Sequence, residues 1–409
     1  MCAWQVIEGG VTEPQGFTAA GVSAGIKESG KKDMALIYAG KPCSAAGVFT
    51  QNLVKAAPVL LDMEHLKKTK GIAQAIIVNS GNANACTGGQ GMQDARAMAQ
   101  LTAAKLGIEP ETVLVSSTGV IGQLLPMEKV EAGVALAAAS LSKAGSRDAA
   151  EAIMTTDTKP KEIAVKFTLQ GKEVTIGAMA KGAGMIHPNM ATMLCFITTD
   201  AVIEPAALKQ ALQTAVDATF NMLTVDGDTS TNDTVLILAS GLAGHEELTE
   251  GSDGYADFVD ALTYACGDLA RKIAADGEGA TKLLEVEVRN APSLRDARLV
   301  AKAVASSNLV KTALFGEDAN WGRILCAAGY SGAQFDPYKV DIYLKSRAGQ
   351  LQTAAQGAGI PFDEEQAALI LKEKEITFIL DLHGGEAGAT AYTCDFSYDY
   401  VRINADYRT

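Results

Sequence analysis

The sequence predicts an α/β (α+β) fold, because short strand-like runs and longer helix-like patterns alternate along its first two thirds. The apolar residues 75–78 and 113–115 are typical of short buried strands. Apolar residues recur every three to four positions in residues 94–106 and 127–141, which is typical of helices.

The length of the chain predicts more than one domain. A chain of 409 residues exceeds the size at which one hydrophobic core keeps growing. After a long helical pattern at residues 255–275, strand patterns dominate at 284–288, 340–344, 376–382 and 389–396, with helical patterns at 301–307 and 364–371. We therefore predict a larger domain over residues 1–280 and a smaller α/β domain over residues 281–409.

Two strands and a turn are predicted in the middle of the chain. Residues 163–169 and 172–178 alternate apolar and polar side chains around Gln170-Gly171, which predicts a hairpin because glycine tolerates the positive φ of a tight turn. Residues 193–197 are too apolar for a strand that faces solvent. Pro205 stands where the first turn of a helix over 206–219 would begin.

The charge and cysteine content exclude several classes of function. The net charge is −13, from 35 basic and 48 acidic residues, and the sequence contains no block of Lys and Arg. We therefore do not expect nucleic acid or an anionic membrane surface as a partner. Seven cysteines without CxxC pairs indicate neither a disulfide framework nor a zinc site. The first residues do not show a basic segment followed by an apolar run, as a signal peptide would. No apolar stretch reaches the ~18 residues that are needed to span a bilayer. We expect a cytoplasmic protein that binds small molecules.

Two polar or glycine-rich segments resemble binding loops only superficially. Asp226–Asp233 alternates acidic residues, but Gly227 is at the second position of the loop and Ile237 at the twelfth, which does not fit an EF-hand. Residues 81–91 lack the Lys-Ser/Thr of a phosphate-binding loop. We expect no metal and no resident nucleotide cofactor.

The segment 181–194 carries the most information. It runs from the glycine-rich Lys181-Gly182-Ala183-Gly184 through a turn stiffened by Pro188 to Thr192, at the mouth of the apolar run. By itself, this is a tight connection into a rigid strand. Residues 116–122 follow another predicted strand, in a turn where side chains and backbone N–H groups can converge on an anion.

Together with five further segments, in the same order, residues 181–194 resemble the ornithine acetyltransferase (glutamate N-acetyltransferase) family. The resemblance covers residue 9 to the C-terminus, through Gly9–Phe17, Gly47–Thr50, Asn79–Cys86, Asp226–Thr234 and Gly316–Arg323. It implies a DmpA/ArgJ-like N-terminal-nucleophile-type fold of layered sheets and helices. It also implies autoproteolysis of the Ala191-Thr192 bond, which lies in the predicted larger, catalytic domain, into chains 1–191 and 192–409.

The resemblance makes Thr192 the nucleophile. Its hydroxyl can attack the preceding carbonyl, and the cut frees an α-amine on the same residue. An α-amine has an ordinary pKa of about 7.7–8.0, so it can act as the base at working pH, and no histidine, His187 included, is required. The family also implies that Thr118, through its hydroxyl, and Gly119, through its N–H, form the oxyanion hole.

The family further implies a substrate site for α-amino acids. Lys181 can pair with a carboxylate and Glu278 with an ammonium, while Thr155 and Asn404 offer neutral hydrogen bonds. The smaller domain supplies part of this site. The implied binding residues are Thr155, Lys181, Thr192, Glu278, Asn404 and Thr409.

The implied reaction transfers acetyl from N2-acetyl-L-ornithine to L-glutamate through acetyl-Thr192, in arginine biosynthesis. Acetyl-CoA is an additional donor in bifunctional members of the family, and an α2β2 assembly of cleaved chains is implied. An N-terminal-nucleophile aminopeptidase, in which water attacks the acyl-enzyme, would need the same nucleophile and oxyanion hole. An uncleaved amino-acid-binding protein is the non-enzymatic alternative.

Overall fold

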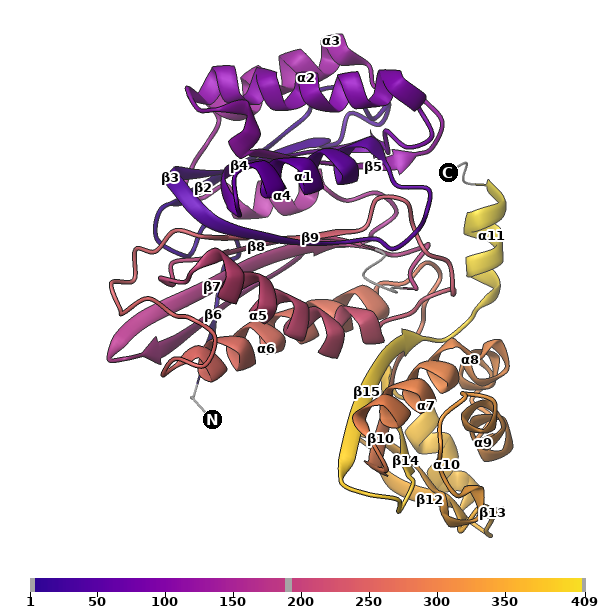
Figure 1. Ribbon diagram of the computed structural model, residues 1–409. Coiled ribbons are helices and arrows are strands. Elements are labelled where there is room, and N and C mark those ends of the chain that lie inside the picture. The colour runs from indigo at the N-terminus through magenta and orange to yellow at the C-terminus, as the bar shows by residue number, and fades with distance from the viewer. Residues whose placement is uncertain (1–3, 188–192, 407–409) are drawn as a thin grey trace.

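The computed structural model of the protein describes residues 4–187 and 193–406 and contains two sheets flanked by helices (Figure 1). The predicted α/β class and the predicted layering of sheets and helices are confirmed. No helix in these two ranges is both long and apolar enough to cross a membrane.

The first sheet has the strand order β1-β6-β7-β8-β9-β3-β4-β5, with β2 paired to β3. Strands β8 and β9 are parallel to each other, as are β4 and β5, whereas the other neighbours are antiparallel. The bounds are β1 Gln5–Ile7, β2 Phe17–Val22, β3 Met34–Phe49, β4 Ile72–Asn82, β5 Val113–Val120, β6 Lys161–Leu169, β7 Lys172–Lys181, β8 Leu194–Thr199 and β9 Thr234–Ala239.

The long strand β3 belongs to two layers of this sheet. Its first part pairs with β2 and β4, its last part pairs with β9, and the register with β4 shifts between Tyr38 and Cys43. Alternate residues of β4, such as Ile76, and of β9, such as Leu236, share one core. Their neighbours in the two strands face separate outer cores. The sheet therefore folds back on itself at β3, and its two halves pack face to face.

Helices cover both outer sides of this double layer (Figure 1). One side carries α1 Ala57–Lys68, α2 Gly88–Leu106 and α3 Met127–Ala139, and the other carries α5 Pro205–Ala218 and α6 Tyr255–Ala275. The short helix α4 Ser146–Ala152 lies inside, where its alanines join the core between the two half-sheets. The order of layers is helices, sheet, sheet, helices.

The hairpin predicted around Gln170-Gly171 joins β6 and β7. Gln170 has a φ of 48° and Gly171 a φ of 74°, so both turn residues have the left-handed backbone of a tight two-residue turn. Residues 161–169 pair without a register shift with residues 172–180, from Leu169↔Lys172 at the turn to Lys161↔Ala180 at the far end. The second strand thereby delivers Lys181, its last residue, to the edge where β8 begins.

The second sheet has the order β13-β12-β11-β14-β10-β15, and all of its strands follow residue 280. Its strands are β10 Leu283–Ala291, β11 Asp341–Ser346, β12 Gly349–Ala355, β13 Ala358–Gly359, β14 Glu375–Asp381 and β15 Ala387–Cys394. Its core is completed by α7 Leu294–Ser306, α8 Asn308–Phe315, α9 Trp321–Gly329 and α10 Glu364–Leu371. A division into independent domains at residue 280 stays a prediction.

The last helix, α11 Tyr398–Asp406, leaves the second sheet after β15 and extends toward the first (Figure 1). None of its described side chains is buried. The ring of Tyr400 lies 4.5 Å from that of Phe396, which anchors the start of the helix. Its inner face therefore remains available to a site on the first sheet.

Candidate active site

One cavity of about 240 Å³ lies where β8 and β9 begin and where β5 and β7 end. All the predicted site residues that the structure describes line it: Thr118, Gly119, Thr155, Lys181, Glu278 and Asn404. Ala191, Thr192 and Thr409 lie outside the described residues. Met193, which directly follows Thr192, lines the cavity as well.

Thr118 and Gly119 come from the end of β5. The strand runs to Val120 and α3 begins only at Met127, so the expected strand-to-helix turn over residues 116–122 is wrong. The strand is longer because its polar residues are buried in the sheet, where the Ser117 hydroxyl donates a 2.6 Å hydrogen bond to Asn79.

Gly119 needs to be glycine for two reasons. Its φ is 132°, outside the range of ordinary L-residues, and a Cβ there would lie 2.3 Å from the carbonyl carbon of Gly81. The backbone of β5 thus approaches that of β4 closely beside Thr118. This close pairing fixes the peptide that would supply the oxyanion N–H.

Lys181 is buried at the end of β7 and contacts the predicted oxyanion hydroxyl. Its Nζ donates a 3.3 Å hydrogen bond to Thr118 Oγ1. Burial lowers the pKa of Lys181, and the nearby carboxylate of Asp157 opposes that effect. Because Thr118 accepts from Lys181, its own hydroxyl proton stays available for an acceptor in the cavity.

Glu278 and Asn404 meet at another part of the cavity lining. The Glu278 backbone N–H donates to the carbonyl of Ala183 at 2.8 Å, which ties it to the glycine-rich segment after Lys181. Its carboxylate accepts a 2.8 Å hydrogen bond from Asn404 Nδ2 on α11. The wall thus joins a segment after α6 to the last described helix.

Asp226 and Tyr400 are among the cavity residues that were not predicted as site residues from the sequence. The Asp226 carboxylate accepts hydrogen bonds from the backbone N–H of Met185 at 2.6 Å and of Ile186 at 2.8 Å, and Tyr400 Oη lies 3.3 Å from it. Burial raises the pKa of both Asp226 and Tyr400. Asp226 therefore holds the turn that precedes the predicted cleavage segment. The alternating acidic pattern of residues 226–233 was visible in the sequence, but the hydrogen-bond partners of Asp226 were not.

His187, at the end of the described part of this turn, has structural contacts. Its Nδ1 lies 3.0 Å from Thr224 Oγ1, and its carbonyl accepts a 2.9 Å hydrogen bond from Thr229 Oγ1. Burial lowers the pKa of His187, which favours the neutral ring. These contacts fix the backbone that enters the segment containing Thr192.

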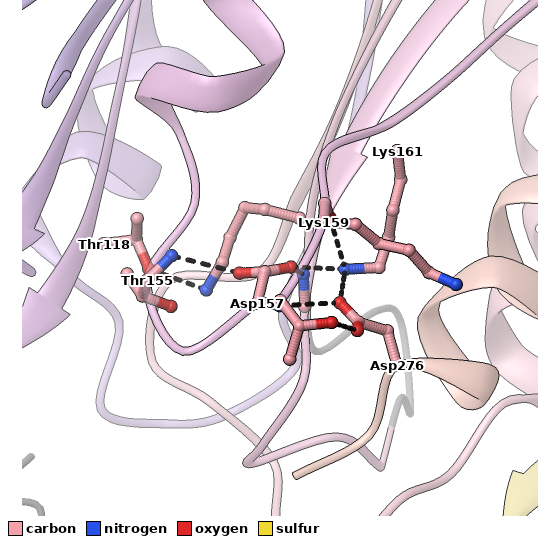
Figure 2. A network of polar contacts seen from close by, with 9 residues as sticks. Thr118, Thr155, Asp157, Lys159, Lys161 and Asp276 are labelled. Atoms are coloured by element: carbon pink, nitrogen blue, oxygen red, sulfur yellow. Dashed lines mark hydrogen bonds and ion pairs between the residues drawn. The ribbon is translucent and has the colours of Figure 1, made fainter. Parts of the chain in front are cut away.

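A buried ion cluster lies directly behind the cavity and was also missed. Lys161 Nζ is 2.6 Å from a carboxylate oxygen of Asp157 and 2.6 Å from one of Asp276 (Figure 2). The two acids lie two residues from Thr155 and Glu278 respectively, so their sequence positions were a usable signal. Within the described ranges, no group of three or more His, Cys, Asp or Glu side chains could hold a metal ion.

Comparison with known proteins identifies the family. The ArgJ family profile matches residues 18–409. "Arginine biosynthesis bifunctional protein ArgJ" of Symbiobacterium thermophilum is 60% identical over 405 residues, covering 98% of this chain and 99% of that protein. The protein of the same name from Caldanaerobacter subterraneus subsp. tengcongensis is 58% identical over 405 residues, covering 99% of this chain and 100% of the relative.

A solved structure is also similar. The crystal structure of arginine biosynthesis bifunctional protein argJ from Bacillus halodurans has 48% sequence identity and a TM-score of 0.49, covering 51% of this chain and 97% of that chain. The family profile and the two relatives each span nearly the whole sequence. This chain therefore belongs to the ArgJ family.

Proposed function

We propose that this protein is an acetyltransferase of arginine biosynthesis that moves acetyl from N2-acetyl-L-ornithine to L-glutamate through acetyl-Thr192. The observation that carries the proposal is one cavity, which is lined by six family-assigned residues from five separate segments and by Met193, the residue after the proposed nucleophile. The names of the relatives support the same pathway.

The first reaction of Thr192 is the cut that creates the active form. Its hydroxyl oxygen attacks the carbonyl carbon of Ala191, the C–N bond breaks, and the nitrogen takes up the hydroxyl proton. Water then hydrolyses the resulting ester, which leaves a carboxylate on Ala191 and a free α-amine and hydroxyl on Thr192. The same side chain is then ready for acetyl transfer.

In acetyl transfer, the Thr192 hydroxyl attacks the acetyl carbonyl while the α-amine accepts its proton. The developing oxyanion accepts hydrogen bonds from the Thr118 hydroxyl and the Gly119 N–H. The proton passes to the departing amine of ornithine. The amine of glutamate then attacks the carbonyl carbon of acetyl-Thr192, and the bond between that carbon and Thr192 Oγ breaks. The α-amine takes the proton that the glutamate nitrogen loses and passes it to Thr192 Oγ, and N-acetylglutamate leaves.

The cavity suits substrates of this kind. Its volume is about 240 Å³, and its lining offers both charged and neutral polar groups. Lys181 offers a cation for the α-carboxylate, and Glu278 offers an anion for an ammonium group. Thr155 and Asn404 add neutral hydrogen bonds to these charged contacts.

Incubation with acetylornithine and labelled glutamate tests the transferase. Labelled N-acetylglutamate is expected, with ornithine as the second product. Free acetate without labelled product would instead favour the aminopeptidase-type alternative, in which water is the acceptor. Intact chains of 409 residues with no turnover would favour the amino-acid-binding alternative.

Further properties belong to the same proposal. Acetyl-CoA is a second donor, which the word "bifunctional" in the names of the relatives supports, and no resident cofactor takes part. Repeating the labelled-glutamate assay with acetyl-CoA in place of acetylornithine tests this. The cleaved chains assemble as α2β2 in the cytoplasm, and the molecular mass of the native protein in solution checks the assembly.

A further inference from the structure

We propose that Asp157 is a positioning residue of the acetyl-transfer site, whose buried carboxylate holds the Thr155 and Lys181 segments together and maintains the charge of Lys181. The inference rests on the proposed function, because it assigns a role within that reaction. Asp157 does not line the cavity, so it acts through its neighbours.

Both carboxylate oxygens of Asp157 are used. Oδ1 accepts a 2.7 Å hydrogen bond from the backbone N–H of Gly182 and lies 2.6 Å from Lys161 Nζ. Oδ2 accepts a 3.0 Å hydrogen bond from the backbone N–H of Thr155. The side chain is fully buried. One carboxylate thus joins the residue after Lys181 to Thr155 itself, and both of these segments form walls of the cavity.

Lys161 extends the connection to a third wall. Its side chain is 1% exposed, and its ammonium donates to Asp157 and to Asp276 (Figure 2). Asp276 also accepts a 3.1 Å hydrogen bond from the backbone N–H of Thr158. Because Asp276 lies two residues before Glu278, the cluster links the three segments that carry Thr155, Lys181 and Glu278.

The charges of the cluster do not cancel. The two carboxylates carry two negative charges and Lys161 carries one positive charge, so a negative charge remains beside the buried Lys181. Asp157 stays ionised, because Lys161 and Lys181 outweigh its burial and lower its pKa to about 2. In the low-dielectric interior, this charge favours the protonated form of Lys181.

Other groups act on the same ammonium. Asp233 and Glu278 raise the pKa of Lys181, whereas burial and Lys161 lower it. Lys27 is also close: burial first, and then the charge of Lys181, lower the pKa of Lys27 to about 8 against the opposing effect of Asp33. The Nζ of Lys27 donates to the Met154 carbonyl at 2.7 Å. Among the acidic groups that raise the pKa of Lys181 against the effect of burial, Asp157 has the largest effect. Removing its charge therefore lowers the pKa of Lys181 further.

Asp157→Asn in the full-length, cleaved enzyme tests both effects. The KM for glutamate should rise on the order of tenfold, the factor for losing a hydrogen bond to a charged group. The alkaline limb of the pH–rate profile, which reports deprotonation of Lys181, should move about one pH unit lower. Rates are normalised to the fraction of chains cut before Thr192, measured by mass spectrometry.

Asp200→Asn is the matched control. Asp200 is also a buried carboxylate, and its two oxygens accept backbone hydrogen bonds from Thr175 at 2.8 Å and Gln15 at 3.1 Å. It does not line the cavity. A general loss of stability would affect both variants, but only Asp157→Asn should move the KM and the alkaline limb.

Lys161→Gln supplies an independent measurement with the opposite sign. It removes a positive charge that lowers the pKa of Lys181, so its alkaline limb should move to higher pH. This variant decides the question if Asp157→Asn does not fold. The positioning role would be overturned if the alkaline limb of the pH–rate profile of the folded variants stayed at the same pH as in wild type. In that case the wild-type protein would still make labelled acetylglutamate. Failure of the proposed function would instead leave the wild type without that product.

Discussion

The side-chain amide of Asn404 donates a 2.8 Å hydrogen bond to the carboxylate of Glu278, although the two residues are 126 positions apart. Asn404 lies on α11, which has no buried side chain of its own. This hydrogen bond therefore mainly positions the two side chains in the cavity wall and contributes little to the stability of the fold.

Asn404→Ala should weaken substrate binding while the protein stays folded. Glu278 would lose its partner and could turn away from the substrate amine, so the KM for glutamate should rise on the order of tenfold. Steady-state kinetics measure this. Val401→Ala on the same helix, at a position that is 63% exposed, is the control. Equal KM values in both variants would contradict the prediction.

Gly119→Ala should remove most of the activity and some of the stability. A Cβ would lie 2.3 Å from the carbonyl carbon of Gly81 and 2.5 Å from the amide nitrogen of Asn82, so β5 must shift and move the oxyanion N–H. We expect a rate loss of about 10²–10³.

The control for this variant is Gly122→Ala, where φ is also positive but no atom lies within 4 Å of the added Cβ. Comparable turnover in the Gly119→Ala and Gly122→Ala variants would argue against an oxyanion hole at this position. Chemical denaturation separates the stability cost from the catalytic one.

Thr192→Ala should leave the chain uncut and inactive, because the attacking hydroxyl and the later nucleophile are the same group. Mass spectrometry of the purified protein should find one chain instead of fragments 1–191 and 192–409. Thr192→Ser, which keeps the hydroxyl, should still cut. Two fragments from the alanine variant would contradict the assignment of the nucleophile.

Asp62→Asn should stabilise the protein increasingly as pH rises. Asp62 is fully buried, its Oδ1 accepts a 2.7 Å hydrogen bond from Val115, and among the described residues its Oδ2 has no partner. Burial raises its pKa well above 3.8. The folded state therefore holds this proton to higher pH than the unfolded chain, so stability falls as pH rises above that ordinary value.

Asparagine does not titrate, so the stability advantage of the variant should grow steadily between pH 4 and pH 8 as the unfolded wild-type chain loses the proton that the folded state retains. Urea denaturation at several pH values measures it. The exposed Asp260→Asn serves as the control. An advantage that is constant with pH would refute the prediction.

The periodicity of the sequence predicted many elements, because their buried faces repeat regularly. The helix predicted over residues 255–275 is Tyr255–Ala275, and the strand predicted over 389–396 is Ala387–Cys394. Strand β3 was missed because the exposed residues 40–42 interrupt its apolar pattern where it passes between layers. Helix α11 was missed because no face of it is buried.

The site was predicted only through family resemblance. Thr118 and Lys181 are separated by 63 positions, and their contact depends on the pairing of β5 and β7 with different parts of the sheet. Asp157 and Asp276 were visible in the sequence, but nothing local indicates that Lys161 joins them. Such partners follow from tertiary packing and not from spacing along the chain.

Strands β8 and β9 lie between β7 and β3 in the first sheet. A cut before Thr192 therefore places two strands of the second fragment between strands of the first, with a hydrogen-bonded ladder on each side. The products are interwoven, so they should co-purify until denatured. Mixing two separately refolded halves should restore little activity, whereas unfolding and renaturing them together allows the shared sheet to form.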